Sequence, residues 1–148
     1  MAERSSSEDI RREHIRDMGA ELGAVYNALW NDAVWLHAKW NLYRQLYAHS
    51  PERVALLNKV AGHFFGVIQD AVVEDILLNL ARLNDPPRSR GRDNLTLQRL
   101  PELITDAPLA SELQGVVEAA SKACEPMRSW RNRRLAHRDL VVALASRA

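Results

Sequence analysis

The sequence has a single cysteine, Cys124, among its 148 residues, so it can form no internal disulfide, and a reducing cytoplasm is the expected location. No apolar run reaches the roughly 18 residues that a membrane span needs, and the N-terminus carries no stretch of the signal-peptide kind. The net charge of +1 identifies no partner by itself. The sequence therefore predicts one cytoplasmic domain over residues 1–148 without a membrane partner.

Motifs for metal and phosphate binding are also missing. The histidines have no partners at a spacing typical of a zinc site, and no Glu-x-x-His pair is present. The chain has no glycine-rich phosphate-binding loop. We therefore expect no metal and no cofactor, and any chemistry has to come from amino-acid side chains.

Helical periodicity dominates what is present. Apolar residues recur at every third or fourth position over residues 22–47, and a second helix is expected over 51–83. A last long helix is expected to begin after the cap Asp106 and to continue to about residue 140. Because no strand-like alternation is present, the predicted fold is all-α, an antiparallel bundle of about four to five helices, several of them long.

Three segments lie outside the long helices. We expect a flexible N-terminus over about residues 1–6 and a basic, polar loop over about residues 85–95. Residues 96–103 can form a short helix that ends before Pro101 or crosses it. A serine-rich start before Glu8 and Asp9 predicts a further helix near the N-terminus.

The apolar face of the last helix leads into positive charge. That face consists of Leu113, Val117, Ala120, Cys124 and Met127. Its next two steps reach Arg131 and Arg134, and the neighbouring stripe through Val116 and Ala123 leads to Arg134 and His137. A buried cation without a partner is costly, so each one needs an acid, a second subunit or an anionic ligand. We therefore expect a functional site at this end of the helix.

The segment from Arg131-Asn132 to His137 resembles the R-x(4–6)-H motif of the HEPN superfamily, including the polar residue after the arginine. Residues 131–139, 81–87 and 94–100 are similar to the AbiU-type branch, which is linked to abortive phage infection. The resemblance covers roughly residues 20–140 and implies a helical, metal-independent endoribonuclease. It further implies a homodimer with the active site at the two-fold interface.

The resemblance also implies roles for individual residues. His137 is expected to act as general acid and base, Arg131 to stabilise the phosphate, and Asn132 to position the substrate or fix the tautomer of His137. Histidine titrates near neutral pH, and arginine presents a planar fork of donors to phosphate oxygens. The residues expected to bind the RNA substrate are Arg133, Arg134 and Arg138. The expected biology is that of a toxin or of phage defence, restrained by an antitoxin or a regulatory protein.

The six-residue spacing of the motif does not fit an ideal helix. Positions six apart lie about 240° round the helix axis, so Arg131 and His137 would not share a face. Either the helix is irregular here, or the two residues cooperate from opposite subunits, or Arg134 is the working cation.

A structural interpretation stands beside the catalytic one. The arginines can pair with Glu74 or Asp75 of a facing helix, and His137 can simply stabilise the end of its own helix. The chain would then be a catalytically inactive helical module that binds RNA or a protein, as an antitoxin-like subunit does. The arginines of the 85–95 loop are likewise either a clamp on an RNA backbone or part of a solvated connection.

Overall fold

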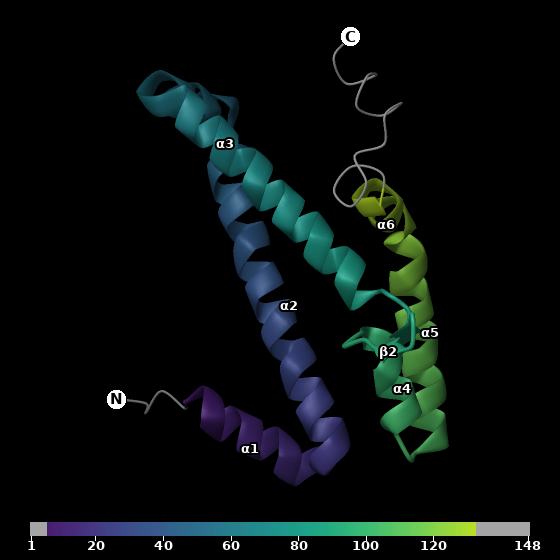
Figure 1. Ribbon diagram of the computed structural model, residues 1–148. Helices are drawn as coiled ribbons and strands as arrows, with labels where there is room; N and C mark the ends of the chain where they lie inside the picture. The colour runs from purple at the N-terminus through teal and green to yellow at the C-terminus, as the bar shows by residue number, and fades with distance from the viewer. Residues whose placement is uncertain (1–5, 133–148) are drawn as a thin grey trace. The chain divides into compact units, whose positions relative to one another are not determined.

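The computed structural model describes residues 6–132, so most of the predicted flexible N-terminus lies outside the described residues. This part of the chain contains six α-helices and two very short strands, and the all-α prediction is confirmed (Figure 1). The elements are α1 (Ser7–Met18), α2 (Ala20–Tyr47), α3 (Pro51–Leu83), β1 (Arg88–Ser89), β2 (Arg92–Asp93), the 3₁₀ helix η1 (Leu97–Arg99), α4 (Leu100–Leu103), α5 (Ala107–Ala123) and α6 (Glu125–Trp130).

The chain divides into two compact units. The first unit comprises the chain up to Asp32 together with Arg82–Cys124, and the second comprises Ala33–Ala81 together with the chain from Glu125 on. The long helices α2 and α3 each contribute to both units. The prediction of a single domain stays a prediction.

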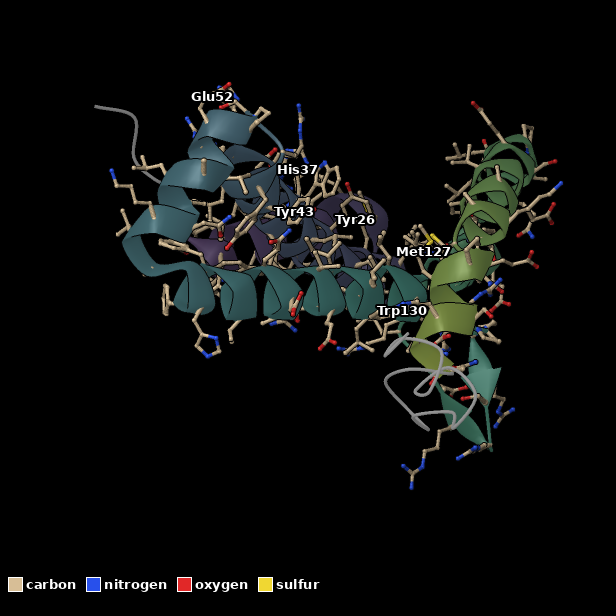
Figure 2. The ribbon with its side chains drawn as sticks, turned by 90° about the horizontal axis from the view of Figure 1, so that it is seen from above. Tyr26, His37, Tyr43, Glu52, Met127 and Trp130 are labelled. Atoms are coloured by element: carbon tan, nitrogen blue, oxygen red, sulfur yellow. The ribbon has the colours of Figure 1, made fainter. Side chains whose placement is uncertain are left out.

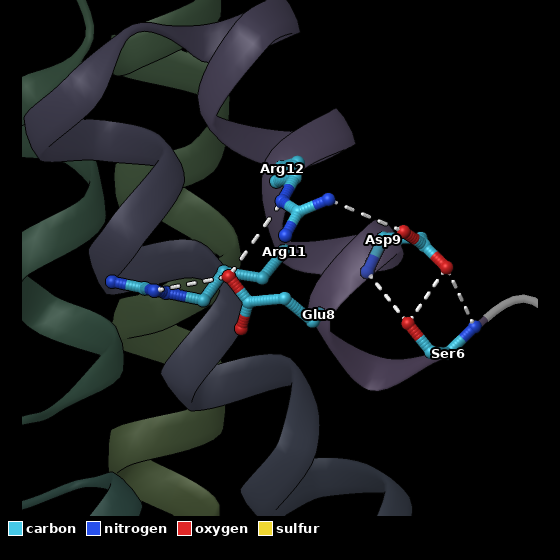
Figure 3. Close-up of polar contacts among 5 residues, drawn as sticks. All are labelled: Ser6, Glu8, Asp9, Arg11 and Arg12. Carbon is cyan, nitrogen blue, oxygen red and sulfur yellow. Dashed lines mark hydrogen bonds and ion pairs between the residues drawn. The ribbon is translucent and has the colours of Figure 1, made fainter.

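In the first unit, α1 and the start of α2 pack closely around Gly23. Ser6 caps α1 in a reciprocal arrangement with Asp9, which confirms the predicted helix start (Figure 3). Gly19, at φ +85°, ends α1 and separates it from α2. The backbone of Gly23 lies against that of His14, whose ring Nδ1 is 3.1 Å from Asn27 Oδ1.

In the second unit, α2 turns back into α3 and the two helices run antiparallel (Figure 1). The Tyr47 hydroxyl donates to the Phe65 carbonyl at 2.9 Å, and its partial burial raises the pKa of Tyr47. Ser50 Oγ accepts from the Arg53 N–H at 3.2 Å and so caps α3. The predicted bounds of α3 are confirmed, but an interruption at Ala61 (φ −159°, ψ 61°) was not expected.

The predicted loop contains a short hairpin that the sequence pattern did not predict. Ser89 pairs with Arg92 across antiparallel strands, and the turn residues Arg90 and Gly91 have φ values of 50° and 76°. Two positive φ values in a two-residue connection define a type I′ turn, the form that suits the twist of a hairpin. Strands of two residues are too short to produce an alternating pattern, which is why periodicity missed them.

The rest of the first unit forms around α5. The short helix crosses Pro101, because proline is tolerated in a first helical turn, and α4 and η1 pack against α5. The predicted cap is confirmed, since the Leu109 N–H donates to Asp106 Oδ1 at 2.9 Å. The buried residues of this region are Leu83, Asn84, Thr96, Leu100, Val117 and Cys124. Over residues 6–132, no helix is long and apolar enough to cross a membrane.

Candidate functional site

The structure describes two of the predicted site residues. Arg131 and Asn132 follow directly after α6 in the second unit. The remaining predicted residues lie outside the described part of the chain: Arg133, Arg134, His137 and Arg138. Their roles therefore stay predictions, and the geometry of the site is built from its first two residues and from the helix that leads to them.

The prediction of one continuous last helix is wrong. The chain leaves α5 at Cys124, whose N–H still bonds to the Ala120 carbonyl, and α6 begins at Glu125. Pro126 explains the break, because proline has no N–H for an intrahelical bond and its ring clashes with the preceding turn. Proline is tolerated at the start of a new helix, so the sequence carries this signal two residues after Cys124.

The break after α5 affects the prediction that its apolar stripes continue to the arginines. The stripe through Leu113, Val117 and Cys124 does face inward, since Val117 and Cys124 are buried. The neighbouring stripe is not a buried seam, because Val116 is 62% exposed and Ala123 is also exposed. Extrapolating either stripe from α5 to the arginines is therefore unsound, and the position of Arg131 depends on α6 instead.

An apolar pocket in the second unit meets α6 through Met127. The pocket has a volume of about 500 Å³, and its lining is almost entirely apolar. Its walls are Ala33, Leu36, His37 and Trp40 of α2, Ile76, Leu77 and Leu80 of α3, and Met127 of α6. Figure 2 shows Met127 and Trp130 on α6 and His37 on α2. Met127 lies four residues before Arg131, so the motif begins about one helical turn beyond this pocket.

At Arg131 and Asn132 the backbone is π-helical. A π-helical turn is wider than an α-helical one and changes the direction of the side chains that follow it. It is the kind of irregularity that the first explanation of the six-residue spacing requires. No local sequence signal indicates a π-helical turn, so this feature could not have been predicted from periodicity.

The two described site residues contact each other. The partly buried Arg131 donates from Nε to Oδ1 of the exposed Asn132 at 3.1 Å. A guanidinium held through Nε keeps its two terminal nitrogens in a fixed plane, the geometry that binds two phosphate oxygens at once. The contact joins the first two residues of the predicted motif, and the role of Asn132 stays a prediction.

Asp75, which the structural interpretation offered to the arginines, has another partner. Its Oδ2 lies 2.5 Å from Lys39 Nζ of α2 and accepts from Asn79 Nδ2 at 3.1 Å. The pair joins α2 to α3 within the second unit. A pairing between two helices depends on their register, so the spacing along either helix alone could not reveal it.

Two of the described histidines, His14 and His37, have defined neighbours. His14 contacts Asn27 and stacks edge-on against Tyr26, whereas His37 lines the apolar pocket. Among residues 6–132, no three histidine, cysteine or acidic side chains gather at a distance suited to one metal ion.

The fold and the described part of the site define a helical chain. In it a hydrogen-bonded arginine–asparagine pair follows a short helix, as the HEPN resemblance implies. The family model of AbiU2-type HEPN domains matches residues 19–148, and the chain belongs to this family. The match includes the whole segment from Arg131 to His137 and supports a general role of the abortive-infection HEPN type. No curated protein and no solved structure matches the chain.

Proposed function

We propose that the chain is a metal-independent endoribonuclease. The family match across residues 19–148, which includes the Arg131–His137 motif, is the observation that supports it most. In the proposed reaction a base removes the proton of a ribose 2′-OH, and the 2′-oxygen attacks the adjacent phosphorus. The bond from phosphorus to the 5′-oxygen breaks, and an acid protonates the leaving oxygen. The products are a 2′,3′-cyclic phosphate and a 5′-hydroxyl.

The residue roles follow from the chemistry of each group. His137 exchanges the protons, and Arg131 compensates the negative charge that builds up on the phosphate in the transition state. Asn132 orients Arg131, as its 3.1 Å contact with Nε supports. The arginines that bind the flanking RNA are Arg133, Arg134 and Arg138.

The active enzyme in this proposal is a homodimer. The reaction needs a base and an acid, and each chain offers one histidine in the motif, so a two-fold axis would bring two motifs together. A set of exposed apolar side chains on α3, on both sides of the interruption at Ala61, supports association. It consists of Leu56 (58% exposed), Val60 (70%), Phe64 (58%) and Val67 (55%). Large apolar side chains exposed to this degree are typical of a surface that a partner covers.

The biological setting we propose is a toxin or a phage-defence factor in the cytoplasm. An RNase without a metal requirement is active wherever RNA is present, so the cell has to restrain it. An antitoxin or another regulatory protein would provide that restraint.

Cleavage of RNA in the presence of EDTA tests the proposal. The purified wild-type chain should convert mixed RNA into fragments with 2′,3′-cyclic phosphate ends, and His137→Ala should abolish this, with a loss of at least about 100-fold. Circular dichroism of the variant would verify that it folds. Intact RNA with the wild-type chain, together with a retarded complex on a gel, would instead identify a catalytically inactive RNA-binding module.

The choice between Arg131 and Arg134 is tested by single alanine variants. We expect Arg131→Ala to lower kcat by about 100-fold, because a transition-state charge loses its partner. Arg134→Ala should mainly raise KM, since it removes a contact with bound RNA. An inactive Arg134→Ala beside an active Arg131→Ala would refute the assignment.

A further inference from the structure

The hairpin of β1 and β2 is an ordered platform for positive charge. Its type I′ turn places Arg90 and Gly91 at the tip. Asn94 holds its base, because its backbone N–H donates to the Pro87 carbonyl and its side-chain Nδ2 donates to the Pro86 carbonyl, each at 2.8 Å. The same Nδ2 donates to Ser89 Oγ at 3.0 Å. The arginines therefore project from a fixed backbone.

The charges of the hairpin are unbalanced. Asp93 Oδ1 lies 3.7 Å from Arg88 Nε and 3.7 Å from Arg99 Nη1, so one carboxylate serves two arginines. Arg90 and Arg92 are exposed, and neither forms an ion pair with another residue between positions 6 and 132. By contrast, the exposed arginines of α1 all pair with neighbouring acids, as Arg11 and Arg12 do with Glu8 (Figure 3). The hairpin thus presents two exposed cations that an external anion can bind.

The hydrogen bonding of Ser89 adds a neutral donor beside one of these cations. Ser89 is directly opposite Arg92 in the hairpin, and directly opposite residues of an antiparallel pair lie on the same face. Its oxygen already accepts from Asn94, so its hydroxyl proton is available to a further acceptor. A guanidinium and a hydroxyl on one face are both donors of the kind that contact phosphate oxygens.

We propose that the arginine hairpin, residues 88–93, binds the phosphate backbone of RNA through Arg90, Arg92 and the hydroxyl of Ser89. The strands and the turn contain no apolar side chain, so they offer nothing to the apolar centre that a protein interface requires. Phosphate contacts work at wet, exposed surfaces and do not depend on base identity. This inference rests on the proposed function only for the choice of RNA as the polyanion.

The salt dependence of RNA binding tests the hairpin. The probe is a fluorescein-labelled 20-mer of 2′-O-methyl uridine, which lacks the attacking hydroxyl and so cannot be cleaved. The full-length wild-type chain should bind it with a log–log salt slope that decreases by about 1.4 in Arg90→Ala/Arg92→Ala, because each phosphate contact to a single strand contributes about 0.7. At 0.1 M salt the variant should bind roughly 10–30-fold more weakly.

A matched variant separates the hairpin from overall charge. Arg11→Ala/Arg12→Ala also removes two positive charges, but from an exposed helix where they are already paired with an acid. This variant should keep the wild-type slope. Arg90→Lys/Arg92→Lys keeps the charges and should also retain most of the slope. An unchanged slope in the Arg90/Arg92 alanine variant, or an equal loss in the α1 variant, would overturn the proposal.

Cleavage of ordinary RNA distinguishes the two proposals. If the hairpin does not bind RNA but His137→Ala still abolishes cleavage, only the hairpin inference fails. If wild-type chain never cleaves RNA but the hairpin variant loses salt-dependent binding, the hairpin inference stands and the nuclease proposal fails. Binding of the probe that is indifferent to salt would exclude a phosphate clamp and overturn the hairpin inference.

Discussion

The carboxylate of Asp9 accepts two hydrogen bonds from Ser6, one from the hydroxyl at 2.6 Å and one from the backbone N–H at 3.1 Å. These bonds favour the charged form, so they hold the pKa of Asp9 below its ordinary value of 3.8. Because the pKa of Asp9 is depressed in the folded state, the carboxylate stabilises the folded helix at pH values above its unfolded-state pKa. This contribution is lost as the pH falls below about 3.8 and through the lower folded value.

We therefore expect the first turn of α1 to fray as the solution is acidified below pH 3.8. An NMR titration of the Asp9 carboxyl carbon, together with amide exchange in α1, would measure both effects. Ser6→Ala removes the hydroxyl donor and should move the pKa of Asp9 upward, toward its ordinary range. A wild-type Asp9 that titrates at its ordinary value would contradict the hydrogen-bonded cap.

Capping residues were the part of the local structure that the sequence specified best. Ser50 and Asp106 each precede a helix and accept a backbone N–H three residues later, as expected from their types. The partner of Asp75 could not be predicted in this way, because Lys39 lies on another helix and the contact depends on how α2 and α3 align. The Arg131–Asn132 contact was missed for a local reason, because it arises in a π-helical turn that periodicity does not indicate.

At the scale of whole elements, close approach of α1 and α2 depends on a glycine. A methyl group at position 23 would lie 2.5 Å from the carbonyl oxygen of His14 and 2.6 Å from the Cα of Ile15. Both neighbours are backbone atoms, so they cannot move aside as a flexible side chain would. Gly115 in α5 provides the contrast, because a methyl group there would have no neighbour within 4 Å.

The two glycines should respond to alanine in opposite directions. Gly23→Ala should lower the free energy of unfolding by about 1–3 kcal/mol, the usual cost of overpacking. Gly115→Ala should raise it by about 0.5–1 kcal/mol, because alanine restricts the unfolded chain and suits a helix interior. Urea unfolding followed by circular dichroism measures both at comparable m values. Equal effects at the two positions would contradict the close packing of α1 on α2.

Breaks between elements were harder to predict than the elements themselves. The periodicity gave α2 and α3 almost at their observed bounds because long amphipathic helices repeat the same signal over many turns. The end of α5 at Cys124 was missed because the apolar spacing continues across it, although Pro126 indicates a new helix start. The hairpin was missed because only its Arg90-Gly91 turn, and no alternation, marks it.

At the scale of the whole molecule, the proposed mechanism requires two histidines from two chains. The exposed apolar side chains of α3, among them Val60, Phe64 and Val67, would be costly on an isolated chain and favour association. One chain has a mass of 16.8 kDa, and light scattering of the purified protein should therefore give twice that mass. A monomer that cleaves RNA at its full rate would contradict the two-histidine mechanism.

Mixed dimers provide a sharper measurement of the same requirement. When wild-type and His137→Ala chains are co-expressed in equal amounts and pair at random, about one quarter of the dimers contain two wild-type chains. If each active site needs His137 from both chains, activity per total protein should fall to about one quarter of the wild-type value, because mixed dimers are inactive. If each chain instead carries an independent site, activity should fall only to about one half. A differently tagged second chain allows the mixed dimers to be purified, and full single-site activity in them would show that one histidine is sufficient.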